Sequence, residues 1–370
     1  EHNDYIRCTL VDMYARCGSL ERAYAVFERL TKENIVMWNT LIIGYCDYGF
    51  SKQALELFYE MQCEGIKPQR VTFIGALKAC TNILAYDNGR KIHVDIVESG
   101  LEWGTYIGNA LINMYGKCGN LTDAKCVFER LPSQNTVTWN SLITVFVQYG
   151  ACEEALQIFQ KMQIQFEPDK VTFICVIKAC LQIAALQYGK VVHTLVVDSI
   201  FASDISVNNT LIDMYVNCGS FHDAQCVFHK MSNPNVVTWS TLIAGYADHG
   251  QAEEALELFE KMHEDGIQPN EVTFVGILKA CSSIGAIQHV WSVHSLVIEN
   301  GLEVDIVVSR TLMDAYIRCL SLEHGYCMFQ RLRERDVTAW TVLIEGCIQL
   351  DCVDEGMRLL EGIYEENLDL

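Results

Sequence analysis

Cysteine and histidine are the residue types in this sequence best suited to metal binding or nucleophilic chemistry. The chain of 370 residues holds 17 cysteines and 10 histidines, yet no two cysteines stand in the C-x-x-C spacing of a zinc site. Many of the cysteines recur instead at fixed places of a long repeat, as in Cys17, Cys118, Cys218 and Cys319, and in Cys80, Cys180 and Cys281. Recurrence of this kind favours small buried side chains in packed helices over ligands, and so many thiols favour a reducing compartment. We therefore assign no metal site.

Catalysis has equally little support. His93, His193 and His294 share one position of the repeat, which favours core or capping histidines. The H-x-E and P-C-x-x-C signature of zinc deaminases is absent from the sequence, and no phosphate-binding loop occurs. We expect no catalytic residue and no cofactor in this segment, although a catalytic domain could lie downstream or act in trans.

A long repeat organises the chain. The stretch "CTLVDMYARCGSLERAYAVF" from Cys8 returns as "GNALINMYGKCGNLTDAKCVF" from Gly108 and as "NNTLIDMYVNCGSFHDAQCVF" from Asn208. The long unit divides into shorter units, for example 236–270, 271–305 and 306–336. A repeat length in the thirties is typical of stacked helix pairs.

Each short unit predicts two helices. In 236–270, Trp239 and Tyr246 bound a first apolar stripe at helical spacing, and a second stripe follows after a glycine. Gly266 and Pro269 then supply a stop and a turn. Because neither helix can bury its stripe alone, neighbouring pairs must stack, and we expect an all-α fold, an α-solenoid superhelix of tandem helix-turn-helix repeats.

Composition limits the possible partners. Half of the residues are hydrophobic and the formal net charge is −20. No apolar run is long enough for a membrane span, and no signal segment opens the sequence. The acids crowd predicted second helices, as in "EEALELFEKMHEDG", so we expect them on the outer face, with a modestly basic groove along the first helices.

The motifs resemble those of the plant organellar PLS class of pentatricopeptide repeat proteins. "TVTWNSLITVF" from Thr136 resembles a P motif, "VTFVGILKAC" from Val272 an L motif, and "N-x-L-I-x-M-Y-x-x-C-G" an S motif. The resemblance implies binding of single-stranded RNA, one base for each P or S repeat, by the recognition part of an organellar C-to-U RNA editing factor in a mitochondrion or chloroplast. It also implies docking of editing cofactor proteins on L motifs, and no membrane.

The resemblance implies one array over 1–370. Its motifs would be S 4–34, P 35–69, L 70–104, S 105–135, P 136–169, L 170–204, S 205–235, P 236–270, L 271–305, S 306–336 and a partial P 337–370.

In this class the fifth and the last residue of a motif read one base, and the second residue wedges against it. The base-reading residues would be Asn39, Gln69, Asn109, Asn135, Asn140, Asp169, Asn209, Asn235, Ser240, Asn270 and Thr341. The wedges would be Val36, Tyr106, Val137 and Val237, while Ser206 is a poor wedge. Taken singly, each Asn or Ser would be a helix cap or a turn residue, but recurrence in register favours base reading.

The family code gives a base to some motifs only. Asn140 with Asp169 would read U; Asn109 with Asn135 and Asn209 with Asn235 would prefer C over U; Ser240 with Asn270 would read A; Asn39 with Gln69 would accept a pyrimidine. Three further kinds of position would read nothing: Cys8 with Asn34, Arg310 with Asp336 (an ion pair), and the aliphatic Ile74, Ile174 and Val275 of the L motifs.

Basic residues of the first helices would meet phosphates. These are Lys78, Lys178 and Lys279 of the L motifs and Arg16, Lys117 and Arg318 of the S motifs, and the alternative for each is an ordinary solvated side chain. Two other functions stay open: a protein-binding helical-repeat scaffold that docks an editing cofactor, and the recognition arm of a deaminase-bearing enzyme.

Overall fold

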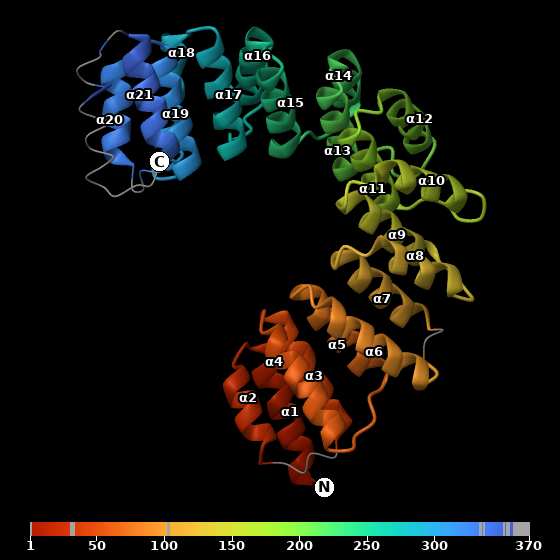
Figure 1. Cartoon of the computed structure of the whole chain (residues 1–370). Helices are drawn as coiled ribbons and strands as arrows, with labels where there is room; N and C mark the ends of the chain where they lie inside the picture. Colours follow the sequence, from red (N-terminus) through yellow and green to blue (C-terminus); the bar gives the residue numbers. More distant parts are fainter. Residues whose placement is uncertain are drawn as a thin grey trace. The chain divides into compact units, whose positions relative to one another are not determined.

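The computed structural model describes residues 2–29, 34–101, 104–332, 335, 337–350, 352 and 356–357. These residues form helices joined by short turns, with no strand among them (Figure 1). The predicted all-α fold is therefore confirmed.

The helices alternate between two roles. The first helices of successive pairs are α1 (His2–Arg16), α3 (Ile35–Asp47), α5 (Arg70–Asn82), α7 (Thr105–Lys117), α9 (Thr136–Gln148), α11 (Lys170–Gln182), α13 (Ile205–Asn217), α15 (Val236–Asp248), α17 (Glu271–Ser283), α19 (Ile306–Arg318) and α21 (Val337–Gln349). The second helices are α2 (Leu20–Phe27), α4 (Ser51–Cys63), α6 (Tyr86–Glu98), α8 (Leu121–Arg130), α10 (Cys152–Met162), α12 (Leu186–Val197), α14 (Phe221–Lys230), α16 (Ala252–Glu264), α18 (Ile287–Glu299) and α20 (Leu322–Arg331).

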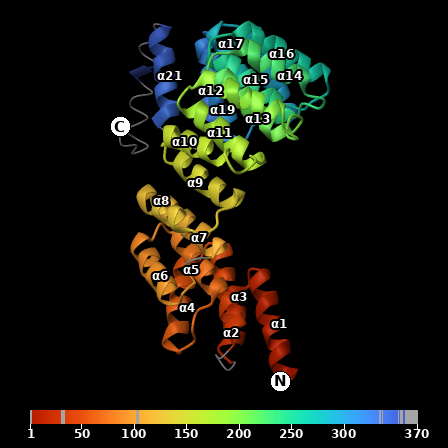
Figure 2. The same ribbon diagram turned by 90° about the vertical axis from the view of Figure 1, so that its right-hand side faces the viewer.

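The chain folds as two compact units, one up to Gln182 and one from Ile183 onward. In the first unit the first helices α1 to α11 pack each against the next, and in the second unit α13 to α21 do the same. Figure 2 shows the pairs of the first unit stacked in chain order. Each second helix packs against the first helix that follows it, whereas successive second helices pack less closely and are joined by side chains, as where Gln62 donates to Asp95 and Tyr86 to Asp123. The first helices therefore form the continuous layer of each unit.

A repeated aromatic contact explains the period of the tryptophans. Each tryptophan of a first helix meets a phenylalanine at the end of the preceding second helix, edge to face, with ring centroids 4.6–4.7 Å apart. The pairs are Phe27–Trp38, Phe128–Trp139, Phe228–Trp239 and Phe329–Trp340. Large aromatic pairs contribute strongly to a core through area and geometry, so they fix the stacking of one helix pair on the next.

One turn departs from its sister turns. Gly18, Gly119 and Gly219 take positive φ between the two helices of their pairs, and Leu320 takes φ 60° at the equivalent place. A residue with a Cβ is disfavoured in this left-handed conformation. The loop before α20 is therefore strained relative to its three counterparts.

The cysteines only partly follow the sequence-based expectation. Cys80, Cys180 and Cys281 are buried, and burial raises the pKa of Cys80 and of Cys281 to about 12. Cys17, however, is exposed, and its counterparts Cys118, Cys218 and Cys319 are only half-buried. The expectation of burial was wrong there because these thiols follow the C-terminal end of a first helix, where the chain turns toward solvent.

The recurring histidines link neighbouring pairs. Nδ1 of His93, His193 and His294 lies 2.7–2.8 Å from the hydroxyl of Tyr115, Tyr215 and Tyr316, respectively. Each histidine belongs to a second helix and each tyrosine to the next first helix. These half-buried histidines therefore form cross-helix hydrogen bonds, which differs from the expected core or capping role.

The described residues were compared with the requirements of a metal site and of a membrane span. No group of three or more His, Cys, Asp or Glu side chains among them could hold a metal ion. None of their helices is both long and apolar enough to cross a membrane.

Candidate nucleic-acid interface

Two side-chain positions recur near the starts of the first helices in the continuous layer. We call them the helix-start pair: the fifth residue of one first helix, and the residue immediately before the next first helix. The residues predicted to read bases occupy these two places, for example Asn140 in α9 and Asp169 before α11.

The pair Asn140–Asp169 is the most completely bonded. Asn140 Nδ2 donates to both carboxylate oxygens of Asp169, at 2.9 and 3.0 Å. Asn140 Oδ1 accepts from the hydroxyl of Thr172 at 2.6 Å. Asp169 Oδ1 in turn accepts from the backbone N–H of Thr172 at 2.9 Å and so caps α11. Because every bond is made within the protein, the two polar groups are held in one arrangement before any ligand binds.

Three further pairs lie close together. Asn209 Nδ2 donates to Asn235 Oδ1 at 3.4 Å, and Asn34 Nδ2 lies 3.6 Å from the sulfur of Cys8. Asn39 and Gln69 are joined through Thr72, whose hydroxyl donates to Asn39 Oδ1 at 2.6 Å and accepts from the backbone N–H of Gln69 at 3.1 Å.

The other predicted base readers are less tightly paired. Asn109 Oδ1 is buried without a hydrogen-bond partner. Ser240 is 3% exposed and its hydroxyl donates to the backbone of its own helix at Val237. Thr341 likewise donates to Val337, and its predicted partner position lies beyond Leu370. The expected ion pair of Arg310 with Asp336 falls on a residue outside the described part.

Helix capping and the predicted base reading fall on the same residues. Oδ1 of Asn135, Asn235 and Asn270 accepts from the backbone N–H three residues later, at 2.9, 3.1 and 3.0 Å. The backbone N–H occupies the side-chain oxygen Oδ1 of the capping residue, because a donor needs an acceptor. When the capping residue is Asn, the side-chain group that stays available to a ligand is therefore Nδ2, a donor. It is Oδ2, an acceptor, when that residue is Asp169. The cap thus decides which chemistry the pair presents.

An exposed apolar side chain stands at the second position of most first helices. The predicted wedges Val36, Tyr106, Val137 and Val237 are 61, 71, 57 and 48% exposed. The sequence analysis missed that the series continues through helices without a polar pair, at Val71, Val171, Val272 and Val307, which are 48–58% exposed. The sequence signal was an apolar residue in the first turn, outside the buried stripe.

A groove in the first unit brings these features together. Its volume is about 870 Å³, and its lining includes Val36, Asn39, Gln69 and Val71. Two exposed valines of successive first helices, 36 and 71, therefore flank the same space as one helix-start pair. A planar apolar-faced group can lie between the valines while its polar edge meets Asn39.

Four of the six predicted phosphate contacts already have an acidic partner. Lys78 pairs with Asp47; Lys279 Nζ lies 2.9 Å from Asp248, Arg16 Nε 2.9 Å from Asp12 and Arg318 Nε 2.9 Å from Asp314. Among the described residues no carboxylate pairs with Lys117 or Lys178. The positions equivalent to the missing acids hold Asn113 and Gln148.

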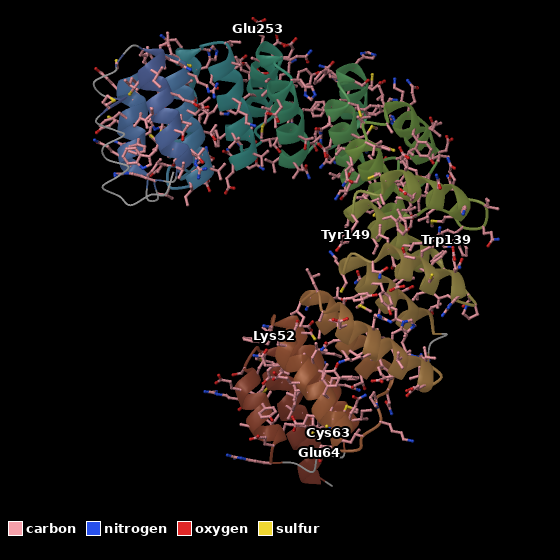
Figure 3. All side chains as sticks on the ribbon, viewed as in Figure 1. Lys52, Cys63, Glu64, Trp139, Tyr149 and Glu253 are labelled. Atoms are coloured by element: carbon pink, nitrogen blue, oxygen red, sulfur yellow. The ribbon has the colours of Figure 1, made fainter. Side chains whose placement is uncertain are left out.

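The acids of the second helices lie apart from the helix-start pairs. Figure 3 shows Glu253 at the start of α16, pointing into solvent, and Glu153, Glu154 and Glu254 are exposed as well. The second helices are thus more acidic than the first helices, which form the continuous layer.

Sequence comparisons agree with this geometry. The PPR repeat family matches residues 33–82, 134–182 and 234–283, and the PPR repeat matches 7–35, 109–135, 209–235 and 338–368. The chain belongs to the pentatricopeptide repeat (PPR) family. This is a repeat family and not an enzyme family, in agreement with the expectation of no catalytic domain in this segment.

Curated relatives come from Arabidopsis thaliana. A chloroplastic pentatricopeptide repeat-containing protein is 32% identical over 336 residues, 90% of this chain and 39% of the relative. A mitochondrial one is 34% identical over 362 residues, 97% of this chain and 47% of the relative. A second chloroplastic one is 32% identical over 367 residues, 99% of this chain and 59% of the relative. The chain thus spans about half the length of the relatives it matches.

Solved structures share the fold. The pentatricopeptide repeat protein PPR10, in complex with an 18-nt psaJ RNA element, superposes with a TM-score of 0.77 at 18% identity, over 99% of this chain and 56% of PPR10. Maize PPR10 in a further crystal structure gives a TM-score of 0.69 at 17% identity, over 98% of this chain and 59% of PPR10. At this identity the likeness defines the fold, and the α-solenoid prediction is confirmed.

Proposed function

We propose that the chain binds single-stranded RNA sequence-specifically through its helix-start pairs, with one base for each P or S repeat of a PLS-type array. The observation that carries the proposal is the pair Asn140–Asp169, in which two polar groups are fixed at the edge of the continuous layer with lone pairs left to accept from a base. A structural cap needs Asp169 alone; it does not need a bonded asparagine twenty-nine residues earlier in the chain.

The side-chain groups that remain available after capping match the hydrogen-bonding edges of the predicted bases. An Asp in the pair offers a second oxygen, which suits the N3–H donor of uracil. An Asn offers an N–H donor, which suits the N3 acceptor of cytosine or the N1 acceptor of adenine. The exposed valines supply apolar surface against which the face of any base can pack. Together they give both affinity and discrimination.

The cellular role that we propose rests on the family pattern. We place this segment in the recognition part of an organellar C-to-U RNA editing factor. Its support is the PLS-like order of motifs, together with relatives that are labelled chloroplastic or mitochondrial. PPR10, with which the fold superposes, was crystallised with RNA.

A second function has an observation of its own. The helices α6, α12 and α18 carry several exposed apolar residues. They are Val94, Val97, Val191, Val197, Trp291 and Ile298, which are 42–58% exposed. These helices belong to the predicted L motifs. We propose that editing cofactor proteins dock there, either beside RNA binding or, in the alternative scaffold function, in place of it.

Selection from a randomised single-stranded RNA pool tests the proposal. With N-terminal repeats meeting the 5′ end, the helices from α7 to α15 should select 5′-pyrimidine (C favoured), U, any base, pyrimidine (C favoured), A-3′. Enrichment of this order supports base reading. A pool that stays random, or binding of double-stranded RNA with equal affinity, overturns it.

A further inference from the structure

A buried threonine accompanies each helix-start pair whose fifth residue is Asn or Ser. It is the third residue of the following first helix, and Thr72, Thr138, Thr172, Thr238 and Thr273 are all 0% exposed. A hydroxyl buried in this way needs a partner, and each of the five lies beside a member of the pair.

The hydroxyl hydrogen goes to the fifth residue in three pairs. Thr72 donates to Asn39 Oδ1 at 2.6 Å, Thr172 to Asn140 Oδ1 at 2.6 Å and Thr238 to Asn209 Oδ1 at 2.7 Å. Contacts of the same hydroxyls to the capping residues are longer, at 2.9 Å for Thr172 and 3.1 Å for Thr238. One hydroxyl carries one hydrogen, so the shorter contact marks where it is donated.

The threonine oxygen has a second bond that fixes the hydroxyl. It accepts from the backbone N–H of the capping residue, at 3.1 Å from Gln69, 3.1 Å from Asp169 and 3.1 Å from Asn235. With one bond accepted from the backbone, the donated hydrogen must point elsewhere, toward the asparagine.

Polar fifth residues and threonines occur together along the sequence. Threonine follows in register wherever the fifth residue is Asn39, Asn109, Asn140, Asn209 or Ser240. Where the fifth residue is Cys8, Ile74, Ile174, Val275 or Arg310, the third residue of the next first helix is Met37, Ile107, Val207, Val308 or Ala339. The threonine therefore occurs together with a polar fifth residue. It is not needed to start a helix, because the other first helices begin without it.

We infer that these threonines are positioning residues that fix the orientation of the base-reading asparagine amide. An amide has an acceptor end and a donor end of nearly the same shape. The threonine holds the acceptor end inward, so the donor end points to the capping residue and the base sees one defined pattern. This inference rests on the proposed function, because the pattern matters only if a base reads it.

Thr172→Val tests the inference at the pair Asn140–Asp169. Valine keeps the shape and removes the hydroxyl, and Val308 occupies the same place in α19, the helix that Asp305 caps. We expect the preference for U over C at this one RNA position to fall by about fivefold or more, the lower end of what a good base-edge pair provides. Thr172→Ser, which restores a hydroxyl, should restore the preference.

Two further variants keep the test decisive. Thr241→Val removes a threonine hydroxyl that bonds only to its own helix at Val237, and it should leave the preference at every position unchanged. Thr238→Val repeats the experiment at Asn209–Asn235 should Thr172→Val fail to fold, and it should weaken the preference for C there.

The outcomes separate this inference from the proposed function. Wild-type protein that shows no base preference overturns both. Wild-type protein that prefers U, with Thr172→Val equally selective and folded by circular dichroism, overturns the positioning role alone. Equal loss of affinity for all bases, without loss of preference, also overturns it, because a merely structural threonine would act in that way.

Discussion

The junction between α9 and α11 and the junction between α17 and α19 are built on the same plan. An aspartate stands before the second of the two helices in each, Asp169 before α11 and Asp305 before α19. Each carboxylate accepts from the backbone N–H of the third helical residue at 2.9 Å. The cap is therefore common to both junctions.

The two junctions differ in the side chains beside the cap. At the first, Asn140 and Thr172 join the aspartate in a hydrogen-bonded cluster; at the second, the same places hold Val275 and Val308. The capping aspartate thus serves the helix in both places, and we propose that base reading requires an asparagine and a threonine in addition to it.

The largest expected effect is the transfer of base reading to the second junction. Val275→Asn combined with Val308→Thr should give α17 a preference for U at a position that otherwise accepts any base. A gain of roughly 1–3 kcal/mol for U over C is expected from a complete base-edge contact. Competition binding with RNAs that differ at that position measures it.

The single variant Val275→Asn serves as the control for this transfer. Without the threonine its amide has no fixed orientation, so its preference for U should be smaller than that of the double variant. If Val275→Asn prefers U over C as strongly as the double variant does, the threonine is not needed for base reading.

Removal of the cap should destabilise both junctions but change binding at only one. Asp305→Ala should lower the free energy of unfolding by about 1 kcal/mol, the usual cost of losing an N-cap, and Asp169→Ala should lower it by more, because it also removes the acceptor of the buried Asn140 amide. Only Asp169→Ala should also lose base preference. Denaturant unfolding and RNA competition, run on the same preparations, check both halves; loss of preference in Asp305→Ala would contradict the account.

The lysines of α11 and α17 should differ in their response to salt. Lys279 is paired with Asp248, whereas Lys178 faces no carboxylate in the described structure. Lys178→Gln should therefore reduce the slope of log K against log salt by about 0.7, the value for one phosphate of a single strand, and Lys279→Gln by less. An exposed ion pair itself contributes little to stability, so both variants should fold normally.

Gln148→Asp sharpens the same comparison, because it supplies Lys178 with the kind of partner that Lys279 has. It should lower RNA affinity as Lys178→Gln does. Titrations over a series of salt concentrations with an unstructured oligouridine provide the measurement, and identical slopes for all variants would mean that neither lysine meets a phosphate.

The smallest expected effect concerns pH at the second junction. Burial, together with the positive charge of Arg331, lowers the pKa of His294 from its ordinary value of 6.5. The folded state therefore favours neutral histidine, and the unfolded state takes up the proton first as the pH falls. Stability should be full above about pH 6.5 and decline below it.

His294→Gln should reduce this decline in Tm, whereas the exposed His263 on α16 offers a control, His263→Gln, that should not. The first junction has no such histidine in its second helix α10. Thermal unfolding at a series of pH values provides the test, and a decline that His294→Gln leaves unchanged would assign it to other groups.

Much of the fold could be predicted from the sequence because it rests on side chains that repeat. The stripe from Trp239 to Tyr246 lies in α15, and both ends of it are buried. Turn glycines such as Gly250 take positive φ, as a break between two helices requires. Residues that recur at one position of the sequence repeat therefore make the same kind of packing contact in successive helix pairs.

The candidate site was less accessible from sequence. A base-reading role for Asn140 followed from family resemblance, but its bond to Thr172 joins residues from different helices, and the register of those helices becomes visible only in the structure. The same holds for the ion pair of Lys78 with Asp47, which joins two helices and from which we expect Lys78 to be a poorer phosphate contact than Lys178. Local sequence patterns do not encode contacts between helices.

Asn270→Asp tests the central claim most directly. Asp169 already occupies the equivalent place and caps α11, so the fold tolerates an aspartate there, and the substitution exchanges a leftover donor for an acceptor. Binding to RNAs that carry A or G at the base facing Ser240 should change from a preference for A to a preference for G. An A-over-G ratio that stays unchanged in a folded Asn270→Asp protein would contradict base reading by the helix-start pair.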